Sequence, residues 1–247
     1  IIAAKDPKSM DKLIQDLKDL DLNLARDATM SEFLGIKFDY RDDGAIHMTQ
    51  AGLISKILST TKMSDCNPNS LPASMAPLGS DKEGEPMEEG WNMRAIVGML
   101  LCLSTNARPG IAHSVNQIAR FVNDPKKSHA SAAKTLLRCL KKTEDKGTIV
   151  KPAKKIDLSL CVDADCAGLF KVEDHRDPAS AKSRTGCVVL LSGWPLLWKS
   201  QLQSHVAQST TEAECTSLSR ALKTHLPLKW LIEEILRNAN HEVLGSP

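Results

Sequence analysis

Residues 156–163 read IDLSLCVD and decide the fold of the C-terminal part of the chain. Every second residue from Ile156 to Val162 is apolar, and this period of two is typical of a β-strand with one buried face. The polar face of the strand ends in acid, at Asp163 and again at Asp165. We therefore expect a strand that carries carboxylates at its C-terminal end.

Two further strands and a long helix are expected after this first strand. Gly186–Leu191 is a nearly continuous apolar run, and a turn joins it to a second strand at Leu196–Gln201. A helix is expected to begin near Ser209 and to continue, bent at Pro227, to Arg237. This order predicts a sheet with a helix packed on it.

The N-terminal part is expected to combine a β-hairpin with helices. Residues 33–40 and 45–49 have strand character and flank RDDG, whose Asp-Gly pair is typical of a hairpin turn. Residues 65–90 are rich in Pro, Ser, Gly and acids and are predicted to be a loop or linker. Helical periodicity marks five segments: 7–20, 50–61, 91–103, 110–121 and 125–143.

The overall composition is that of a globular protein. Of 247 residues, 42% are apolar and 25% are charged, and the longest apolar run, residues 95–103, is too short to cross a bilayer. The seven cysteines contain no CxxC pair, and the histidines form no HExxH motif. These patterns argue against membrane spanning and a zinc site, and they favour reduced thiols.

The net charge of +2 conceals a basic block in the middle of the chain. Residues 108–155 hold 12 basic and 3 acidic residues, whereas the segments on either side are net acidic. Four cations of the helix expected at 125–143 fall within about 60° of one another on a helical wheel: Lys127, Lys134, Arg138 and Lys141. A solvated surface explains such a face as well, but the net charge of +9 favours a phosphate backbone, because clustered cations release condensed counterions.

Two glutamates near the start of the last helix are expected to differ in role. Ser209 and Glu212 have the spacing of a capping box, which gives Glu212 a structural function. Glu214 lies near Leu218 and Ala221 on the helical wheel, so we expect it to face the sheet. A carboxylate on a packing face is costly unless it is paired or bound to a cation.

A divalent cation is one compensation for such a carboxylate. Asp163 and Asp165 are the other acids expected close to Glu214, and clustered carboxylates suit Mg²⁺, which prefers oxygen ligands. An Asp on a strand and a Glu on a helix are half of a two-metal site that cleaves phosphodiesters. Isolated surface acids at a strand end are the alternative that the residues alone leave open.

Five stretches of the chain carry a resemblance to a known family. They are FLGIKF (33–38), the helical region from WNMRAIVG to KKTEDKG (91–147), VDADCAG (162–168), KSRTGCVVLLSG (182–193) and STTEAEC (209–215). In this order they resemble the Pol polyprotein of copia-type LTR retrotransposons. The resemblance extends over essentially the whole chain.

The resemblance implies an α+β or α/β fold made of two parts: the end of a reverse-transcriptase palm with a helical thumb and connection, then a truncated RNase H-like mixed sheet with a helix. It implies four segments: the end of the palm and start of the thumb (1–64), a linker (65–90), a basic helical thumb and connection (91–150), and an incomplete RNase H-like domain (156–247). The polymerase aspartates of the family precede a segment like IIAAKD, so Asp42 and Asp43, in the hairpin turn, are not that pair.

By motif position, the resemblance places the RNase H catalytic residues and metal ligands on Asp163 and Glu214, with Mg²⁺ or Mn²⁺ as the cofactor. Asp165 is either a supporting residue or a strand-end acid. Cys166 and Cys215 stand where the family usually has a tryptophan and a tyrosine. The next catalytic aspartate of the family lies on a strand beyond the helix, so the site is expected to be incomplete in this chain.

The resemblance also implies a function and partners. The parent protein is expected to copy RNA into DNA and to degrade the RNA strand of the hybrid, in cytoplasmic virus-like particles and in the nucleus. This chain is expected to bind RNA/DNA hybrid and template-primer beside the rest of the Pol polyprotein, with little activity alone. A non-catalytic or decayed nucleic-acid-binding remnant, and a pseudogene product that does not fold, are the alternatives.

Overall fold

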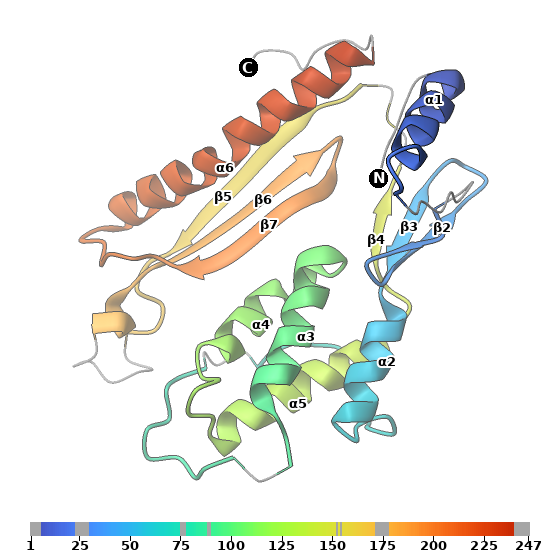
Figure 1. The fold of residues 1–247 in the computed structure, drawn as a ribbon. Helices are drawn as coiled ribbons and strands as arrows, with labels where there is room; N and C mark the ends of the chain where they lie inside the picture. The colour runs from blue at the N-terminus through green and yellow to red at the C-terminus, as the bar shows by residue number, and fades with distance from the viewer. Residues whose placement is uncertain are drawn as a thin grey trace.

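The computed structural model describes residues 6–22, 30–74, 78–87, 90–151, 153, 155–170 and 178–239, which form two antiparallel sheets and a group of helices (Figure 1). In chain order the elements are α1 (Pro7–Lys18), β1 (Glu32–Phe33), β2 (Ile36–Tyr40), β3 (Ile46–Thr49), α2 (Ala51–Thr60), α3 (Met93–Asn106), the 3₁₀ turn η1 (Pro109–Ile111), α4 (Ala112–Ala119), α5 (Lys127–Lys142), β4 (Thr148–Val150), β5 (Leu158–Asp165), the 3₁₀ turn η2 (Pro178–Ala181), β6 (Arg184–Leu191), β7 (Trp194–Leu202) and α6 (Thr210–Asn238).

The first sheet contains the predicted hairpin of β2 and β3 and two strands that the sequence did not indicate. One is β4, and the other is β1, because a turn at Leu34 and Gly35 divides the single strand expected at 33–40 into β1 and β2. The order of the sheet is β1-β2-β3-β4, and all neighbours are antiparallel. In the turn between β2 and β3, Asp43 Oδ1 accepts the Ala45 backbone N–H (3.0 Å), and Gly44 takes φ +77°. β4 pairs with β3 only after the chain has passed through α2–α5, and such a non-local pairing leaves no signal in local sequence.

The helices α2–α5 share one hydrophobic core. The segments predicted from periodicity are helical, because apolar residues recur every three or four positions and are buried together. Ile54, Leu100, Val115 and Leu137 are fully buried in this core, one from each helix. At about 25 cal/mol per Å² of buried apolar surface, side chains of this size each contribute roughly 1.5–3 kcal/mol.

The segment predicted as a linker lies along α5. Its described residues, 65–74 and 78–87, contain no helix or strand. Asn69 N–H donates to Arg138 O (3.1 Å), Met87 N–H donates to Pro125 O (3.2 Å), and Lys127 N–H donates to Glu85 O (3.0 Å). These bonds attach the segment to the helical group at both ends of α5.

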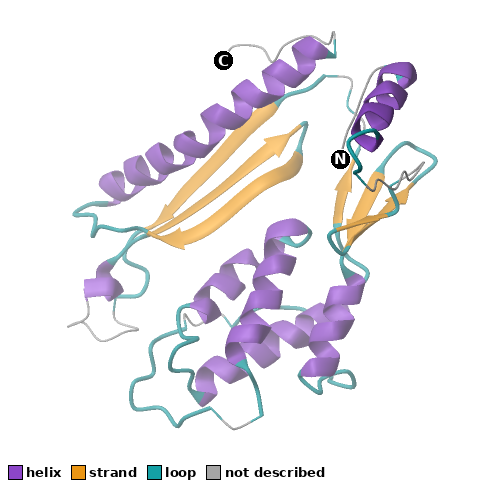
Figure 2. Ribbon diagram, viewed as in Figure 1, coloured by secondary structure: helices purple, strands orange, loops and turns teal. Residues whose placement is uncertain are grey.

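The second sheet has the order β5-β6-β7, and α6 packs on it (Figure 2). The alternation predicted a strand at 156–163, whereas β5 spans Leu158–Asp165. The strand therefore starts and ends two residues later than predicted. α6 is assigned as one helix across Pro227.

The chain is an α+β protein, which is one of the two fold classes expected from the sequence. The strand pairs among the described residues are antiparallel, so the parallel pairing of an α/β or mixed sheet is not seen there. In the same part of the chain, the structure contains no helix with the length and apolar content needed to cross a membrane.

Candidate functional site

The basic face of α5 is positioned by the packing of its opposite side. Ala133, Leu136, Leu137 and Leu140 are fully buried in the helical core. This fixes the rotation of the helix and turns the four predicted cations outward: Lys127, Lys134 and Arg138 are exposed, and Lys141 is half-buried. The predicted separation of an apolar and a basic side is therefore confirmed.

The start of α5 is fixed by a histidine. His129 is fully buried, its Nδ1 accepts the Lys126 backbone N–H (2.9 Å), and its Nε2 lies 2.9 Å from the carbonyl oxygen of Gly79. Because Nδ1 is an acceptor, Nε2 carries the proton and donates to Gly79. The imidazole also stacks on Phe121, with ring centroids 4.2 Å apart.

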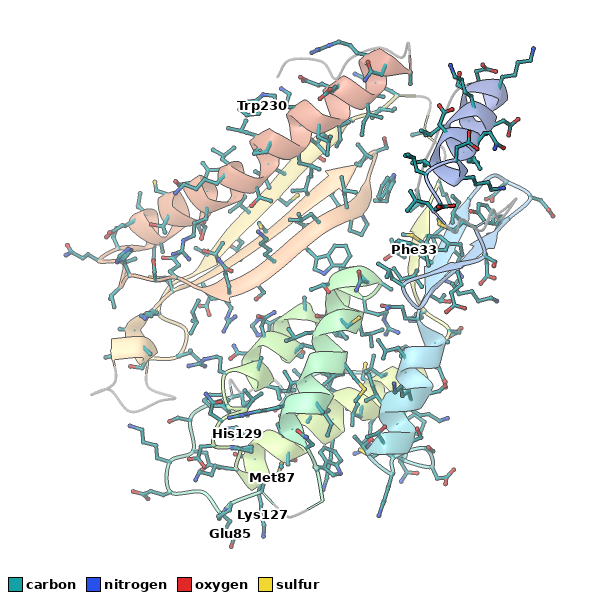
Figure 3. All side chains as sticks on the ribbon, in the orientation of Figure 1. Phe33, Glu85, Met87, Lys127, His129 and Trp230 are labelled. Atoms are coloured by element: carbon teal, nitrogen blue, oxygen red, sulfur yellow. The ribbon has the colours of Figure 1, made fainter. Side chains whose placement is uncertain are left out.

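Two of the four cations contact residues of the segment before α3. Lys127 forms an ion pair with Glu85, and the two side chains point toward each other (Figure 3). The hydrogen bond that Lys127 donates to the Glu85 carboxylate, and then the positive charge of Lys127, lower the pKa of Glu85. The ammonium of Lys134 lies 5.5 Å from the centre of the Trp91 ring, within the range of a cation–π contact.

The other two cations also have partners. Arg138 Nε donates to the carbonyl oxygen of Asn67 (2.6 Å), and Lys141 Nζ lies 3.8 Å from a carboxylate oxygen of Glu144. Ion pairs and hydrogen bonds at an exposed surface contribute little, typically about 0–1 kcal/mol, and salt screens them. A polyanion can therefore compete for these side chains at small cost.

The predicted strand acids lie on the sheet face turned away from α6. Thr185 on β6 faces α6, since its Oγ1 lies 2.9 Å from Ser217 Oγ. Ala164 pairs with Thr185 and shares its face, so Asp163 and Asp165 point to the opposite face. Both aspartates are exposed.

The same face meets the helical group. Trp198 on β7 lies, by register, on the side of the sheet that carries Asp163, and its Nε1–H donates to the carbonyl oxygen of Ser104 on α3 (2.6 Å). The strand acids are therefore on the side of the sheet that approaches α3 and α4.

The predicted orientation of Glu214 is wrong, because this side chain is exposed. The face of α6 that packs on the sheet consists of Ala213, Ser217 and Ala221, whereas Leu218 is 48% exposed. The helical wheel took Leu218 and Ala221 as the packing side, and only Ala221 is buried, because the small residues Ala213, Ser217 and Ala221 allow the helix to approach the sheet closely and occupy the contact. The burial argument for a cation at Glu214 therefore no longer holds.

The predicted capping box is confirmed for the serine and shifted by one residue for the glutamate. Ser209 Oγ accepts the Glu212 backbone N–H (3.1 Å), as expected of an N-cap. The Glu212 carboxylate accepts the backbone N–H of Gln208 (2.7 Å) rather than that of Ser209.

Asp163 and Glu214 have the right donor chemistry for Mg²⁺ but are an incomplete ligand set. Both supply carboxylate oxygens, and they come from neighbouring elements, since α6 packs against β5. Asp163 points away from α6, however, and no group of three or more His, Cys, Asp or Glu side chains gathers anywhere in the described residues. Their assignment as catalytic residues and metal ligands stays a prediction.

A buried polar network below α6 was missed at the sequence level. Gln203, which is 2% exposed, donates through Nε2 to the carbonyl oxygen of Ala213 (2.9 Å) and to Ser217 Oγ (3.1 Å). Ser217 in turn bonds Thr185. Polar residues in a loop or strand carry no periodic signal, so only their tertiary partners reveal them.

Three plant proteins that are similar to this chain are named as retrovirus-related Pol polyproteins from transposons. The chain is 29% identical over 231 residues to the "Retrovirus-related Pol polyprotein from transposon RE1" of Arabidopsis thaliana, covering 94% of this chain and 15% of that protein. It is 30% identical over 199 residues to the corresponding RE2 protein of the same plant, covering 81% and 13%. With "Retrovirus-related Pol polyprotein from transposon TNT 1-94" of Nicotiana tabacum it shares 32% identity over 243 residues, covering 95% and 18%.

The chain belongs to the family of retrovirus-related Pol polyproteins from transposons. This Pol chain spans less than a fifth of the length of these relatives. No protein-family model matches it, and no solved structure gives a significant match.

Proposed function

We propose that this chain is part of a copia-type reverse transcriptase and RNase H, and that it binds an RNA/DNA hybrid through the basic side of α5. The observation that carries the proposal is the position of Lys127, Lys134, Arg138 and Lys141 on one side of a helix whose other side is buried. Cations at such positions contact phosphates without reading sequence, as a polymerase or nuclease substrate requires.

The contacts that these cations make within the chain are compatible with the proposal. Each of them is an exposed or half-exposed contact, as between Lys127 and Glu85, and is weak in water. A hybrid brings many phosphates, and the release of counterions from it supplies a driving force that a single carboxylate does not.

A direct test compares two double variants of the chain. Lys134→Gln with Arg138→Gln is expected to weaken hybrid binding and to reduce the dependence of log K on log[salt] by about 0.9 for each lost phosphate contact. Lys56→Gln with Lys62→Gln removes two exposed cations, one in α2 and one just after it, and is the matched control. Equal binding by the two double variants would contradict the proposed surface.

The second part of the proposal is that Asp163 and Glu214 contribute carboxylates to an RNase H site with Mg²⁺ or Mn²⁺. A bound divalent cation would supply electrostatic stabilisation of a phosphodiester undergoing hydrolysis. The support is the motif resemblance, the oxygen donors of both residues, and the packing of α6 against β5.

Cleavage of a labelled RNA/DNA hybrid by a longer Pol protein that includes this chain tests the carboxylates. Asp163→Asn and Glu214→Gln are each expected to abolish Mg²⁺-dependent cleavage while hybrid binding is retained. Asp157→Asn, an exposed acid before β5, is the control. Robust cleavage by the Asp163→Asn variant would rule out the assignment.

A non-catalytic nucleic-acid-binding module is the second candidate. The observation in its favour is that Asp163 and Glu214 do not gather with a third ligand among the described residues. This candidate predicts salt-dependent hybrid binding and no divalent-metal-dependent cleavage, even by the longer protein.

A further inference from the structure

The segment before α3 places carboxylates against the start of α5. Its described residues 78–87, the acidic segment, hold three acids and one lysine: Asp81, Lys82, Glu83 and Glu85. Glu85 forms an ion pair with Lys127 (Figure 3), and Asp81 Oδ2 accepts the Ser128 hydroxyl (2.5 Å). The first turn of α5 has no acidic residue of its own. The negative charge there therefore comes from residues that lie 42 and 47 positions earlier in the chain.

The backbone of the acidic segment is fixed on α5 at two points. Lys127 N–H donates to Glu85 O (3.0 Å), and the buried His129 donates through Nε2 to Gly79 O (2.9 Å). These bonds keep the carboxylates beside α5 even when their side chains rotate away. A tethered group has a high effective concentration at its partner, which an anion free in solution does not have.

A tight turn directs Asp81 toward α5. Asp81 has φ +45°, a conformation that Asp tolerates better than most residues, and Gly84 N–H donates to Asp81 O (2.9 Å). The carboxylate lies over the turn, so that a Cβ on Gly84 would be 2.3 Å from Asp81 Oδ2. The same oxygen accepts the Ser128 hydroxyl, so the carboxylate is held between the turn and the helix.

The ion pair can open without unfolding the chain. The Lys127 side chain is 51% exposed and the Glu85 side chain is 73% exposed. Both can rotate into solvent, where water and salt weaken their attraction. The contact is therefore closed in the chain alone and open to competition by another anion.

The other end of the basic side has neutral partners in the same part of the chain. Arg138 Nε donates to Asn67 O (2.6 Å), and Lys142 Nζ donates to Ser70 Oγ (2.6 Å). A neutral acceptor leaves the charge of a cation in place, whereas a carboxylate offsets it at short distance. The segment before α3 therefore offsets the charge of Lys127 and leaves that of Arg138.

We infer that Asp81 and Glu85 form an autoinhibitory contact, in which they take the place of phosphate groups at the start of α5 and lower its affinity for nucleic acid. The phosphates of a bound strand displace Glu85 from Lys127 and Asp81 from Ser128. The inference rests on the proposed function insofar as α5 binds nucleic acid. It adds that the chain itself regulates how strongly this surface binds.

Isothermal titration of the full chain with an RNA/DNA hybrid, and separately with inorganic polyphosphate, tests the inference. Asp81→Asn with Glu85→Gln is expected to bind each polyanion roughly two- to fivefold more tightly, the factor that corresponds to an exposed ion pair. Asp65→Asn with Asp145→Asn is the matched control. It removes two exposed acids that contact none of the four cations in the described part of the chain, and it is expected to have a smaller effect.

A double-mutant cycle separates the contact from the change in net charge. In a Lys127→Gln background, Glu85→Gln is expected to leave the affinity unchanged, because the carboxylate no longer has this cation to occupy. A general effect of removing an acid would persist in that background. Equal strengthening by Glu85→Gln with and without Lys127 would overturn the inference.

Glu85→Gln alone changes an exposed side chain, so it keeps the test decisive if Asp81→Asn disturbs the turn. The two ligands separate failure of the inference from failure of the proposed function. If hybrid binding does not depend on Lys134 and Arg138, the proposed function fails, while polyphosphate still shows whether the acids block Lys127. If neither ligand binds more tightly to the variants, the autoinhibitory contact is ruled out, and the hybrid-binding result stands unchanged.

Discussion

Arg108, in the loop after α3, holds the C-terminal end of α5. Its Nη1 donates to Thr143 O (2.7 Å) and Lys146 O (3.3 Å), and its Nη2 donates to Thr143 Oγ1 (2.6 Å). The carbonyl groups at a helix end have no partner within the helix, so a guanidinium that reaches several of them at once stabilises the end.

Replacing Arg108 with methionine is expected to lower the free energy of unfolding by about 2–3 kcal/mol, since charge-assisted bonds to partly buried acceptors are lost. Urea titration followed by circular dichroism measures this change. Arg94→Met removes an exposed arginine that bonds Asn123, and it is expected to cost less than about 0.5 kcal/mol.

His225 on α6 makes the stability of the chain depend on pH. Its Nδ1 is buried and has no hydrogen-bond partner among the described residues. Burial, and then the charge of Lys229, lower the pKa of His225 from 6.5. The unfolded chain therefore binds a proton more readily than the folded chain between this lowered pKa and 6.5.

The expected result is a melting temperature that is steady above pH 6.5 and falls as the pH drops below it, because the folded state resists protonation. His225→Leu should lessen this fall but not remove it, because burial also lowers the pKa of His113, and Lys229→Gln should reduce it by removing the cation. Differential scanning fluorimetry from about pH 7.5 to about pH 5.5 measures the slopes. The same slope in all three proteins would contradict the role of His225.

At the scale of elements, α6 is held on its sheet by small residues and one buried amide. Ala213, Ser217 and Ala221 make the contact, and Gln203 bonds the first turn of the helix from the end of β7. Several apolar residues of α6 are exposed, such as Trp230, which points away from the sheet in Figure 3. The contact through small residues explains why the helix still has a defined rotation on the sheet.

Gln203→Leu is expected to destabilise the docking of α6 by about 2–3 kcal/mol, because Ser217 Oγ and Ala213 O would be left buried without this donor. Amide hydrogen exchange measures the effect. The exchange rate should increase in α6 before it increases in α2–α5. Gln117→Leu changes a half-buried glutamine of α4 in the same way and is the control for general destabilisation.

At the scale of the whole molecule, few polar contacts join the second sheet to the helices. The bond from Trp198 Nε1 to Ser104 O is the shortest described between them, and a cavity of about 440 Å³ at Asp165 lies at the same junction.

Trp198→Phe keeps most of the apolar contact and removes this bond. It is expected to lower the free energy of unfolding by about 1–2 kcal/mol and to broaden the thermal transition, as the halves become less cooperative. Calorimetry measures both quantities. Trp230→Phe, at a side chain that is 62% exposed, is expected to leave the transition unchanged.

The sequence by itself determined most of the elements, the basic side of α5 and the family. Alternation at 156–163 and the Asp-Gly turn at 43–44 are local patterns with one low-energy solution, and they were confirmed. The same is true of α5, where the spacing of leucines and lysines defines two sides of a helix whatever lies against it.

Only the tertiary structure decided the remaining features. β4 joins a strand nearly a hundred residues earlier in the chain, and Glu214 is exposed because the small residues beside it fit the sheet more closely than Leu218 does. The cavity at Asp165 requires residues from four separate segments. Packing between surfaces depends on shape and on distant partners, and neither is encoded in the spacing of residues along one element.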